Sequence, residues 1–351
     1  MKKVIVALVL LLFACGHGAS PAAPSSPTTP AVDPDPLRNA AGTASKLVGA
    51  AVQSSYLNDP AYSAVFARHF DYVTAEYEMK WDPIERTRGV EDFSGGDAIV
   101  GFAAAHGMQA KGHALIWHQA VPSWVSGLSA ADLRIEFERH IRSVATHFRG
   151  RVLAWDVVNE AVADSGSGLR DSMFRQKLGD GYIADAFRIA READPQALLF
   201  YNDYGGEGLT AKSDAIYNLA KDLVAQGVPI DGVGLQMHIG SASPPSDASL
   251  AANMRRLAAL GLRVNISEMD VRVADIGGAT AANLDRQRAV YHSIVADCVA
   301  EPACHAVTFW GFTDAHSWIY NQYGPDAPLL FNGSYAPKPA FYGVFDAFMR
   351  R

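Results

Sequence analysis

Short apolar segments recur along most of the chain, separated by longer stretches in which apolar residues have helical spacing. Several of the short segments lack strict apolar–polar alternation, which is typical of parallel strands covered on both faces. We expect strands at 47–52, 72–75, 110–117, 152–158, 197–201, 232–237, 263–267 and 306–311. We expect helices at 130–148, 181–192, 211–226, 249–260, 284–299 and 337–349.

Strands that alternate with helices in this way predict an α/β fold, and eight such units in one run predict a (β/α)8 TIM barrel. The chain has 351 residues, which suits one barrel domain. No glycine-rich phosphate loop follows a predicted strand, which argues against a doubly wound dinucleotide-binding fold.

The N-terminal region has a composition of its own. Lys2 and Lys3 precede an apolar run at 4–14 that is too short to span a bilayer as a helix, so we predict a signal peptide at 1–19. A linker rich in Pro, Ser and Thr follows at 20–40, and the barrel occupies 41–351.

The signal peptide contains Cys15 directly after a small residue, Ala14. This pattern resembles the cleavage site of bacterial lipoproteins, in which the cysteine is lipidated and anchors the protein to the membrane. Loss of Cys15 with the signal is the alternative. We therefore expect a secreted or otherwise extracytoplasmic protein, and we favour a membrane-anchored lipoprotein over plain secretion.

Composition narrows the classes of partner. Hydrophobic residues make up 49% of the chain and charged residues 19%, as in ordinary soluble globular proteins. The formal net charge of −7 argues against a nucleic-acid partner, which usually requires a basic face. A neutral polymer or a small molecule suits this charge better, and we expect a monomer.

The remaining cysteines, Cys298 and Cys304, form a close pair. In an oxidising compartment such a pair predicts a disulfide that closes a short loop. A zinc site is the alternative, but His305 is the only ligand type close to the pair.

Polar and aromatic residues gather where the predicted strands end. In a TIM barrel the functional groups lie at the carboxyl ends of the strands, so these side chains should meet on one rim. The candidates are Glu76, Lys80, His113, Trp117, Asn159, Glu160, Tyr204, Gln236, His238, Glu268, Asp270, Trp310 and Trp318.

Structural interpretations compete with the functional one at several positions. Asp156 and Trp155 lie inside an apolar strand and are expected to be buried core residues. His113 alone could be a core histidine, and Lys80 alone could face solvent. The pair Glu160 and Glu268 is hardest to explain structurally, because two neighbouring strand-end carboxylates repel each other. Hydrolysis of a glycosidic bond needs such a pair.

Eight ordered motifs support that interpretation. They are TAEYEMKWD (74–82), KGHALIWH (111–118), WDVVNE (155–160), LRDS (169–172), YNDY (201–204), GVPIDGVGLQMH (227–238), ISEMD (266–270) and WGFTDAHSW (310–318). Together they resemble glycoside hydrolase family 10, the family of endo-β-1,4-xylanases, over about residues 44–349.

The resemblance implies a single catalytic barrel that cleaves β-1,4-xylosidic bonds in xylan or xylo-oligosaccharides by retaining double displacement, with no cofactor and no metal. Glu160 matches the general acid/base and Glu268 the nucleophile, while His238 and Asp270 resemble the pair that supports the nucleophile. Asn159 matches the residue that binds the sugar 2-hydroxyl. The other matching substrate-binding residues are Glu76, Lys80, His113, Trp117, Tyr204, Gln236, Trp310 and Trp318.

The chain departs from the family pattern near two of these motifs. Tyr77 replaces an asparagine that grips the sugar on the non-reducing side, and Ala75 replaces a proline. Gly205 and Gly206 replace the asparagine that often follows the YNDY motif, which opens the leaving-group side. We expect Tyr77 to alter substrate recognition; the alternative is that its ring turns away and ordinary xylanase activity remains.

Two other functions fit less well. A carbohydrate-binding pseudoenzyme would be expected to lack one of the two glutamates, and both are present. A glycosidase of the same fold with altered or non-xylan specificity is the alternative that the Tyr77 substitution keeps open.

Overall fold

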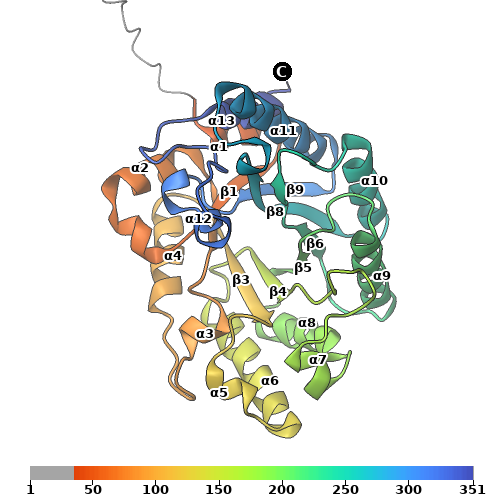
Figure 1. The fold of residues 1–351 in the computed structure, drawn as a ribbon. Coiled ribbons are helices and arrows are strands. Elements are labelled where there is room, and N and C mark those ends of the chain that lie inside the picture. The colour runs from red at the N-terminus through yellow and green to blue at the C-terminus, as the bar shows by residue number, and fades with distance from the viewer. Residues whose placement is uncertain (1–34, 351) are drawn as a thin grey trace, which may run out of the picture. The chain divides into compact units, whose positions relative to one another are not determined.

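The computed structural model describes residues 35–350, so the predicted signal peptide, Cys15 and most of the predicted linker lie outside the described residues. The centre of the described part is a closed parallel barrel (Figure 1). Its strands are β1 (Leu47–Val52), β2 (Tyr72–Ala75), β3 (Gln109–Trp117), β4 (Ala154–Asn159), β5 (Leu198–Asp203), β6 (Gly232–Leu235), β8 (Arg263–Arg272) and β9 (Cys304–Phe309).

Each of these strands pairs in parallel with the next along the chain, and β9 pairs with β1 to close the ring. A short additional strand, β7 (His238–Gly240), pairs with the outer part of β8, where His238 is opposite Asp270. All eight predicted strands are therefore confirmed. The largest difference is at β8, which continues to Arg272 because β7 supplies a partner beyond the predicted end at 267.

Helices surround the barrel (Figure 1). Those predicted from the sequence are α6 (Ala130–His147), α8 (Tyr182–Ala193), α9 (Ala211–Ala225), α10 (Asp247–Ala258), α11 (Ala281–Ala300) and α13 (Pro339–Phe348). The sequence reasoning did not predict α1 (Leu37–Thr43), α2 (Pro60–His69), α3 (Trp81–Ile84), α4 (Ser94–Ala105), α5 (Ser123–Ser126), α7 (Met173–Leu178) and α12 (Trp318–Tyr323). Short 3₁₀ turns lie at Ser54–Asn58, Ala274–Ile276 and Asp314–His316.

Local side chains define where several helices begin. Asp59 accepts a hydrogen bond from Ala61 N before α2, and Ser129 accepts one from Asp132 N before α6. Thr210 forms a capping box with Ser213 at the start of α9. Such caps satisfy backbone N–H groups that have no partner within the helix, which stabilises the first turn.

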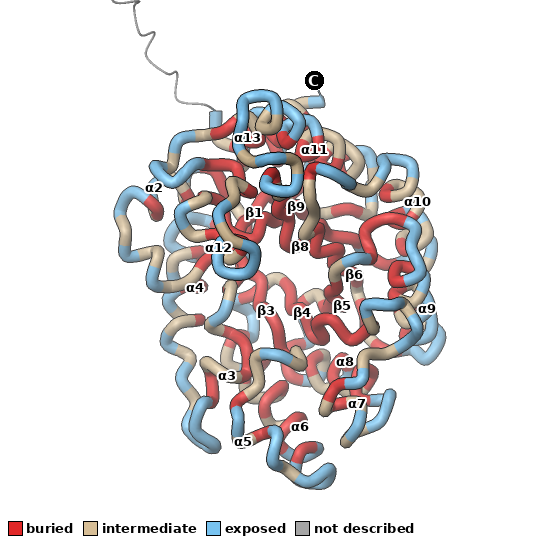
Figure 2. The backbone as a smooth tube through the Cα atoms, viewed as in Figure 1, coloured by how far each residue is buried: buried red, intermediate tan, exposed pale blue. Residues whose placement is uncertain are grey.

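Burial follows the two layers of the barrel. Figure 2 shows that the strands are buried, while the helices expose their outer sides. Trp155 is fully buried, as expected, and it packs over Gly112 of the neighbouring strand. A Cβ atom at Gly112 would lie 2.0 Å from Trp155 Cζ3, so only glycine leaves room for the indole there.

The first described helix shifts a predicted boundary. We expected the linker to run to residue 40, but α1 begins at Leu37. Leu37, Ala40 and Ala41 are buried, and α1 packs against α13. Burial of this apolar face, which follows the Pro-rich segment directly, explains why the domain begins before residue 41. Among residues 35–350, no helix combines the length and the apolar character that a membrane span requires.

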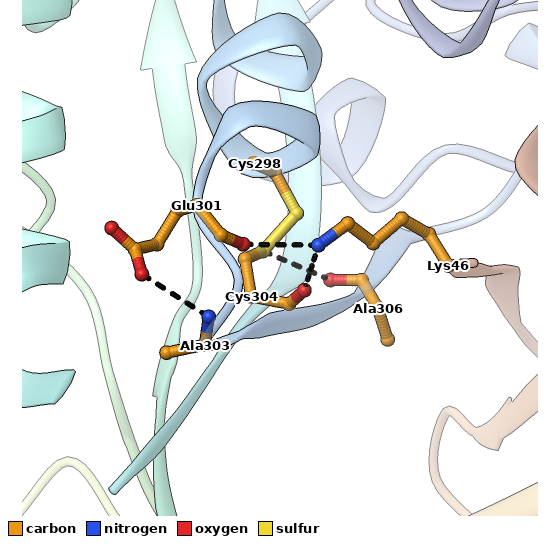
Figure 3. Close-up of a disulfide and its surroundings, with 6 residues drawn as sticks. All are labelled: Lys46, Cys298, Glu301, Ala303, Cys304 and Ala306. Carbon is orange, nitrogen blue, oxygen red and sulfur yellow. Dashed lines mark hydrogen bonds between the residues drawn. A yellow bond between two sulfur atoms is a disulfide. The ribbon is translucent and has the colours of Figure 1, made fainter. Parts of the chain in front are cut away.

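Cys298 and Cys304 form the predicted disulfide, which joins the end of α11 to the start of β9 (Figure 3). Both cysteines are fully buried. The ammonium group of Lys46 donates hydrogen bonds to the carbonyl oxygens of Glu301, at 3.0 Å, and Cys304. The disulfide and Lys46 together fix the turn that enters the last strand of the barrel.

We expect Cys298→Ala to lower the free energy of unfolding by about 2 kcal/mol, because a cross-link over so short a loop restricts the unfolded chain only modestly. The measurement is urea denaturation under non-reducing conditions. Adding Cys304→Ala should lower the free energy of unfolding little further, since the first substitution already removes the cross-link. Fully additive losses from the two substitutions would show that the cysteines do not form a disulfide in solution.

Candidate active site

The carboxyl ends of the barrel strands open into a cleft of about 460 Å³. Eleven of the thirteen rim residues predicted from the sequence line it: Lys80, His113, Trp117, Asn159, Glu160, Tyr204, Gln236, His238, Glu268, Trp310 and Trp318. Asp270 lies directly behind this lining, and Glu76 lines a neighbouring hollow. The sequence reasoning missed three further lining residues: Gln119, on the loop after β3, and Gln322 and Tyr323, at the end of α12.

Glu160 follows the last residue of β4 and is only 7% exposed. Trp117 Nε1 donates a hydrogen bond to Glu160 Oε2 at 2.8 Å. Asn159 Nδ2 and Gln236 Nε2 both donate to Glu160 Oε1 at 3.1 Å. Three side chains from different strand ends therefore fix both oxygens of this carboxyl group.

The backbone of Glu160 is left-handed, with φ of 58°. Non-glycine residues rarely adopt this conformation, and it persists where the surrounding structure imposes it. Glu160 N donates to Asn202 O at 2.8 Å, and Arg170 Nε donates to Glu160 O at 3.0 Å. The chain leaves β4 in a fixed turn that directs the side chain of Glu160 into the cleft.

Glu268 is the second carboxyl group of the cleft and is 3% exposed. Asn202 Nδ2 lies 2.6 Å from Glu268 Oε1, and His238 Nε2 lies 3.1 Å from Glu268 Oε2. The same Asn202 amide donates to Asn159 Oδ1 at 2.8 Å, and Ser267 Oγ donates to Asn202 Oδ1 at 2.6 Å. Asn202 therefore links the surroundings of both glutamates.

The charges around Glu268 favour its ionised form. Burial alone would raise the pKa of Glu268, but the nearby His113, His238 and Lys111 outweigh it and lower the pKa to about 2. For His238, burial opposes the charged form, but Asp270 and Glu268 raise the pKa of His238 well above its usual value. The surrounding charges therefore favour a carboxylate at Glu268 and the protonated form of His238.

Asp270 orients His238 from the other side. Asp270 Oδ2 lies 2.8 Å from His238 Nδ1 and also accepts a hydrogen bond from Trp318 Nε1 at 2.8 Å. One carboxylate oxygen thus fixes both the imidazole and an indole ring of the cleft wall. The pairing of β7 with β8 brings His238 and Asp270 opposite each other, which explains why the predicted pair meets.

His113 is also part of a charged network. Its Nδ1 atom lies 2.8 Å from Asp156 Oδ2, and Lys111 Nζ lies 2.7 Å from the same oxygen. Asp156 is fully buried, which agrees with its predicted structural role. His113 is therefore not an isolated core histidine, because it connects this buried ion pair to Glu268, 3.9 Å away.

One group of described residues has the geometry of metal ligands. His113, Asp156 and Glu268 offer ligand atoms that lie within 4.8 Å of one another. However, Lys111 already contacts Asp156 Oδ2, while Asn202 and His238 contact the two oxygens of Glu268. A divalent cation here would have to compete with these positive and donor groups, so the donor set is poorly suited to a metal.

The walls of the cleft are aromatic. The ammonium group of Lys80 lies 4.4 Å from the ring centroid of Trp117 and 5.7 Å from that of Trp310. Lys80 is 7% exposed, so it does not face solvent as a lone lysine would. Burial lowers the pKa of Lys80, whereas Glu268 and Glu76 raise it, and burial has the larger effect. Flat rings beside a cationic donor suit the faces and hydroxyl groups of a sugar.

Tyr77 lies beside this cleft and not in its lining. Its hydroxyl donates a hydrogen bond to Asp82 Oδ2 at 2.8 Å, and its ring centroid is 5.8 Å from Lys80 Nζ. With Arg86 and Val90, it lines a separate hollow of about 410 Å³. Glu76, one residue earlier, accepts a hydrogen bond from Gln53 Nε2 at 3.1 Å.

Comparison with known proteins agrees with this geometry. Endo-1,4-beta-xylanase B of Thermotoga neapolitana is 40% identical over 317 residues, which is 88% of this chain and 90% of the relative. Endo-1,4-beta-xylanase of Agaricus bisporus is 37% identical over 306 residues, which is 86% of this chain and 90% of that protein.

Solved structures of xylanases are also similar to this chain. Xylanase 10B of Thermotoga petrophila RKU-1, in complex with xylobiose, superposes with a TM-score of 0.87 at 38% identity, covering 91% of this chain and 98% of that one. Native xylanase 10B of Thermotoga maritima has a TM-score of 0.86 at 40% identity, covering 90% and 98%. The profile of Glycosyl hydrolase family 10 matches residues 36–347, and the chain therefore belongs to glycosyl hydrolase family 10.

Proposed function

We propose that this protein is a β-1,4-xylanase that hydrolyses xylan or xylo-oligosaccharides with retention of configuration. One observation carries the proposal: two buried glutamates from different strands, Glu160 and Glu268, face one cleft and are linked through the amides of Asn159 and Asn202. Retaining glycosidases use two carboxyl groups about 5–5.5 Å apart. The solved relative that holds xylobiose supports xylose units as the substrate.

The charge distribution suits Glu268 as the nucleophile. A nucleophilic carboxylate must be ionised, and the pKa of Glu268 is lowered to about 2 against the effect of burial. Glu268 attacks the anomeric carbon and the bond from that carbon to the leaving oxygen breaks. His238, fixed by Asp270, keeps the attacking carboxylate ionised and oriented.

Glu160 supplies the proton that the leaving oxygen needs. In the second half of the reaction a water molecule attacks the anomeric carbon, the bond to Glu268 breaks, and Glu160 takes the proton of that water. The hydrogen bonds from Trp117, Asn159 and Gln236 hold the Glu160 carboxyl group in one position for both steps. Atoms and charge balance over the cycle, so no cofactor is required.

Trp310, Trp318, Lys80 and Asn159 would bind the sugar next to the cleaved bond, and Tyr204 the sugar on the leaving side. They line the same cleft as the two glutamates. The position of Tyr77 favours ordinary xylan recognition, because its hydroxyl binds Asp82 and its ring lines the separate hollow.

We also propose that the enzyme acts outside the cytoplasm. The basic and apolar residues at 1–19 suit an export signal, and Cys15 suits a lipid anchor. The disulfide between Cys298 and Cys304 supports an oxidising compartment.

Replacing either glutamate should separate the two roles. We expect Glu268→Ala to lower kcat on linear xylan by about 10⁴-fold or more, because the covalent intermediate cannot form. With azide and an aryl β-xylobioside, Glu268→Ala should give the α-azide by direct displacement. Glu160→Ala should give the β-azide, because azide then attacks the intermediate on Glu268. Product analysis by NMR distinguishes them, and azides of the reverse configuration would exchange the two roles.

The pH dependence of the first step should depend on His238. In the variant His238→Gln the imidazolium is lost, so we expect the pKa of Glu268 to rise by about 1–3 and the acid limb of kcat/KM to move to higher pH. 2,4-Dinitrophenyl β-xylobioside suits the measurement because its leaving group needs no proton. His106→Gln, at an exposed histidine outside the cleft, is the matched control. An unmoved acid limb would contradict the proposed electrostatic role of His238.

Restoring the family asparagine tests the effect of Tyr77. We expect Tyr77→Asn to change the ratio of kcat/KM on linear xylan to kcat/KM on an aryl xyloside by no more than about threefold, or less than 1 kcal/mol. The physical reason is that the Tyr77 hydroxyl is bound by Asp82 beside the cleft. A tenfold or larger rise in the ratio would show that Tyr77 hinders xylan, and would favour the alternative specificity.

A further inference from the structure

Lys212 is a buried cation near the start of α9, and it is 5% exposed. Its ammonium nitrogen lies 2.9 Å from Asp203 Oδ1 and 3.5 Å from Asp164 Oδ1. The same nitrogen lies 3.4 Å from the ring centroid of Tyr204. A buried lysine is costly unless it is compensated, and here two carboxylates and one aromatic face share that compensation.

The first carboxylate, Asp203, supports the turn that follows Glu160. The hydroxyl of Tyr201 accepts hydrogen bonds from Ala161 N at 3.0 Å and Val162 N at 3.1 Å, and it donates to Asp203 Oδ2. Asp203 Oδ2 also accepts from Val162 N at 3.3 Å. These contacts hold the backbone immediately after Glu160, whose own φ is left-handed.

The charge on Asp203 depends on Lys212. Burial raises the pKa of Asp203 to about 6, although Lys212 opposes this rise. Asp203 is 1% exposed, and Lys212 is the cation that contacts it among the described residues. Without Lys212 the carboxylate would lose this compensation, and its contacts with the turn would weaken.

The second carboxylate, Asp164, binds the hydroxyl group of Tyr204. The Tyr204 hydroxyl donates to Asp164 Oδ1, and Arg170 Nη2 contacts the Tyr204 hydroxyl at 3.1 Å and Asp164 Oδ1 at 2.6 Å. Arg170 Nε also donates to Glu160 O at 3.0 Å. The phenol of Tyr204 is therefore connected to the Glu160 turn through Arg170.

The residues after Tyr204 are held through their backbone: Gly205 N donates to Glu207 Oε1 at 3.0 Å, and Thr210 Oγ1 donates to Gly205 O at 3.1 Å. Gly205 and Gly206 carry no side chains, and Gly205 has φ of 68°. A Cβ atom at Gly205 would lie 3.4 Å from Lys212 Cδ, so the lysine stem passes beside this glycine. The orientation of the Tyr204 ring thus depends on Lys212 at its face and on Asp164 and Arg170 at its hydroxyl.

We propose that Lys212 is a positioning residue that couples the aromatic platform of the leaving-group side, Tyr204, to the turn that carries Glu160. The proposal rests on the proposed xylanase function. Because the ammonium group occupies one face of the Tyr204 ring, a sugar can stack only on the other face. A sugar that stacks there has a fixed position relative to the Glu160 carboxyl group. That group must protonate the oxygen of the same leaving sugar.

The test compares two substrates of the variant Lys212→Met, which keeps the length of the side chain and removes the charge. Xylohexaose places sugars on the leaving side and needs a proton from Glu160, whereas 2,4-dinitrophenyl β-xylobioside does neither. We expect kcat/KM on xylohexaose to fall by about tenfold or more. On the dinitrophenyl substrate we expect a change of no more than about twofold.

Two further variants complete the experiment. Lys221→Met, at an exposed lysine on the same helix, is the matched control and should leave both rates unchanged. Lys212→Arg keeps the charge and should recover most of the rate on xylohexaose.

Two outcomes would overturn the inference. Equal losses on both substrates would assign Lys212 to stability alone, and no loss on xylohexaose would show that Tyr204 does not depend on it. A wild-type protein that cleaves neither substrate would instead contradict the proposed function.

Discussion

Closure of the barrel by pairing of β9 with β1 is the constraint on which the rest of the structure depends. Parallel strands that close on themselves bring all their carboxyl ends to one rim, whatever their separation along the chain. Glu160 and Glu268 are 108 positions apart (268 − 160), yet they reach one cleft because β4 and β8 end on that rim. A strand out of register would move its side chains from the interior to the outer layer.

Burying two carboxyl groups in one cleft requires compensation. The structure supplies it differently for each of them. Glu268 faces His238, His113 and the amide of Asn202, a surrounding that favours the carboxylate. Glu160 accepts hydrogen bonds from the indole of Trp117 and from two side-chain amides. These three donors are neutral groups and carry only partial charges. If one carboxyl group is to act as the nucleophile and the other as the proton donor, their surroundings must differ.

The same principle extends to the surroundings of Tyr204. Lys212, Arg170 and two aspartates form a network of alternating charge around the Glu160 turn and Tyr204. Alternation reduces the cost of burying Lys212 and Asp203, and the network links the Tyr204 ring to the turn that carries Glu160. The two glycines that follow Tyr204 have no side chains that could hold its ring, which contacts Lys212 at its face and Asp164 and Arg170 at its hydroxyl.

Much of the molecule could be predicted from local sequence patterns. Apolar runs predicted all eight barrel strands, and strand-end polar residues predicted most of the cleft lining. Helices α2 and α4 were not predicted. Asn202 was visible in the YNDY motif, but its link between the two glutamates depends on strand neighbours that are distant in sequence. Gln119 lies on a loop, and Gln322 and Tyr323 lie at the end of α12, a short helix that the sequence pattern did not predict.

The sequence by itself determined the fold class, the two glutamates and the chemical class of their neighbours, because these follow from periodicity and from residue type at strand ends. Only the tertiary structure decided which partner each group has. It turned the Tyr77 hydroxyl to Asp82 and placed Lys212 against the face of Tyr204, and it showed that β7 brings the predicted pair, His238 and Asp270, together. Hydrogen bonds, ion pairs and ring contacts act over a few ångströms, so they depend on three-dimensional neighbours that the order of residues does not give.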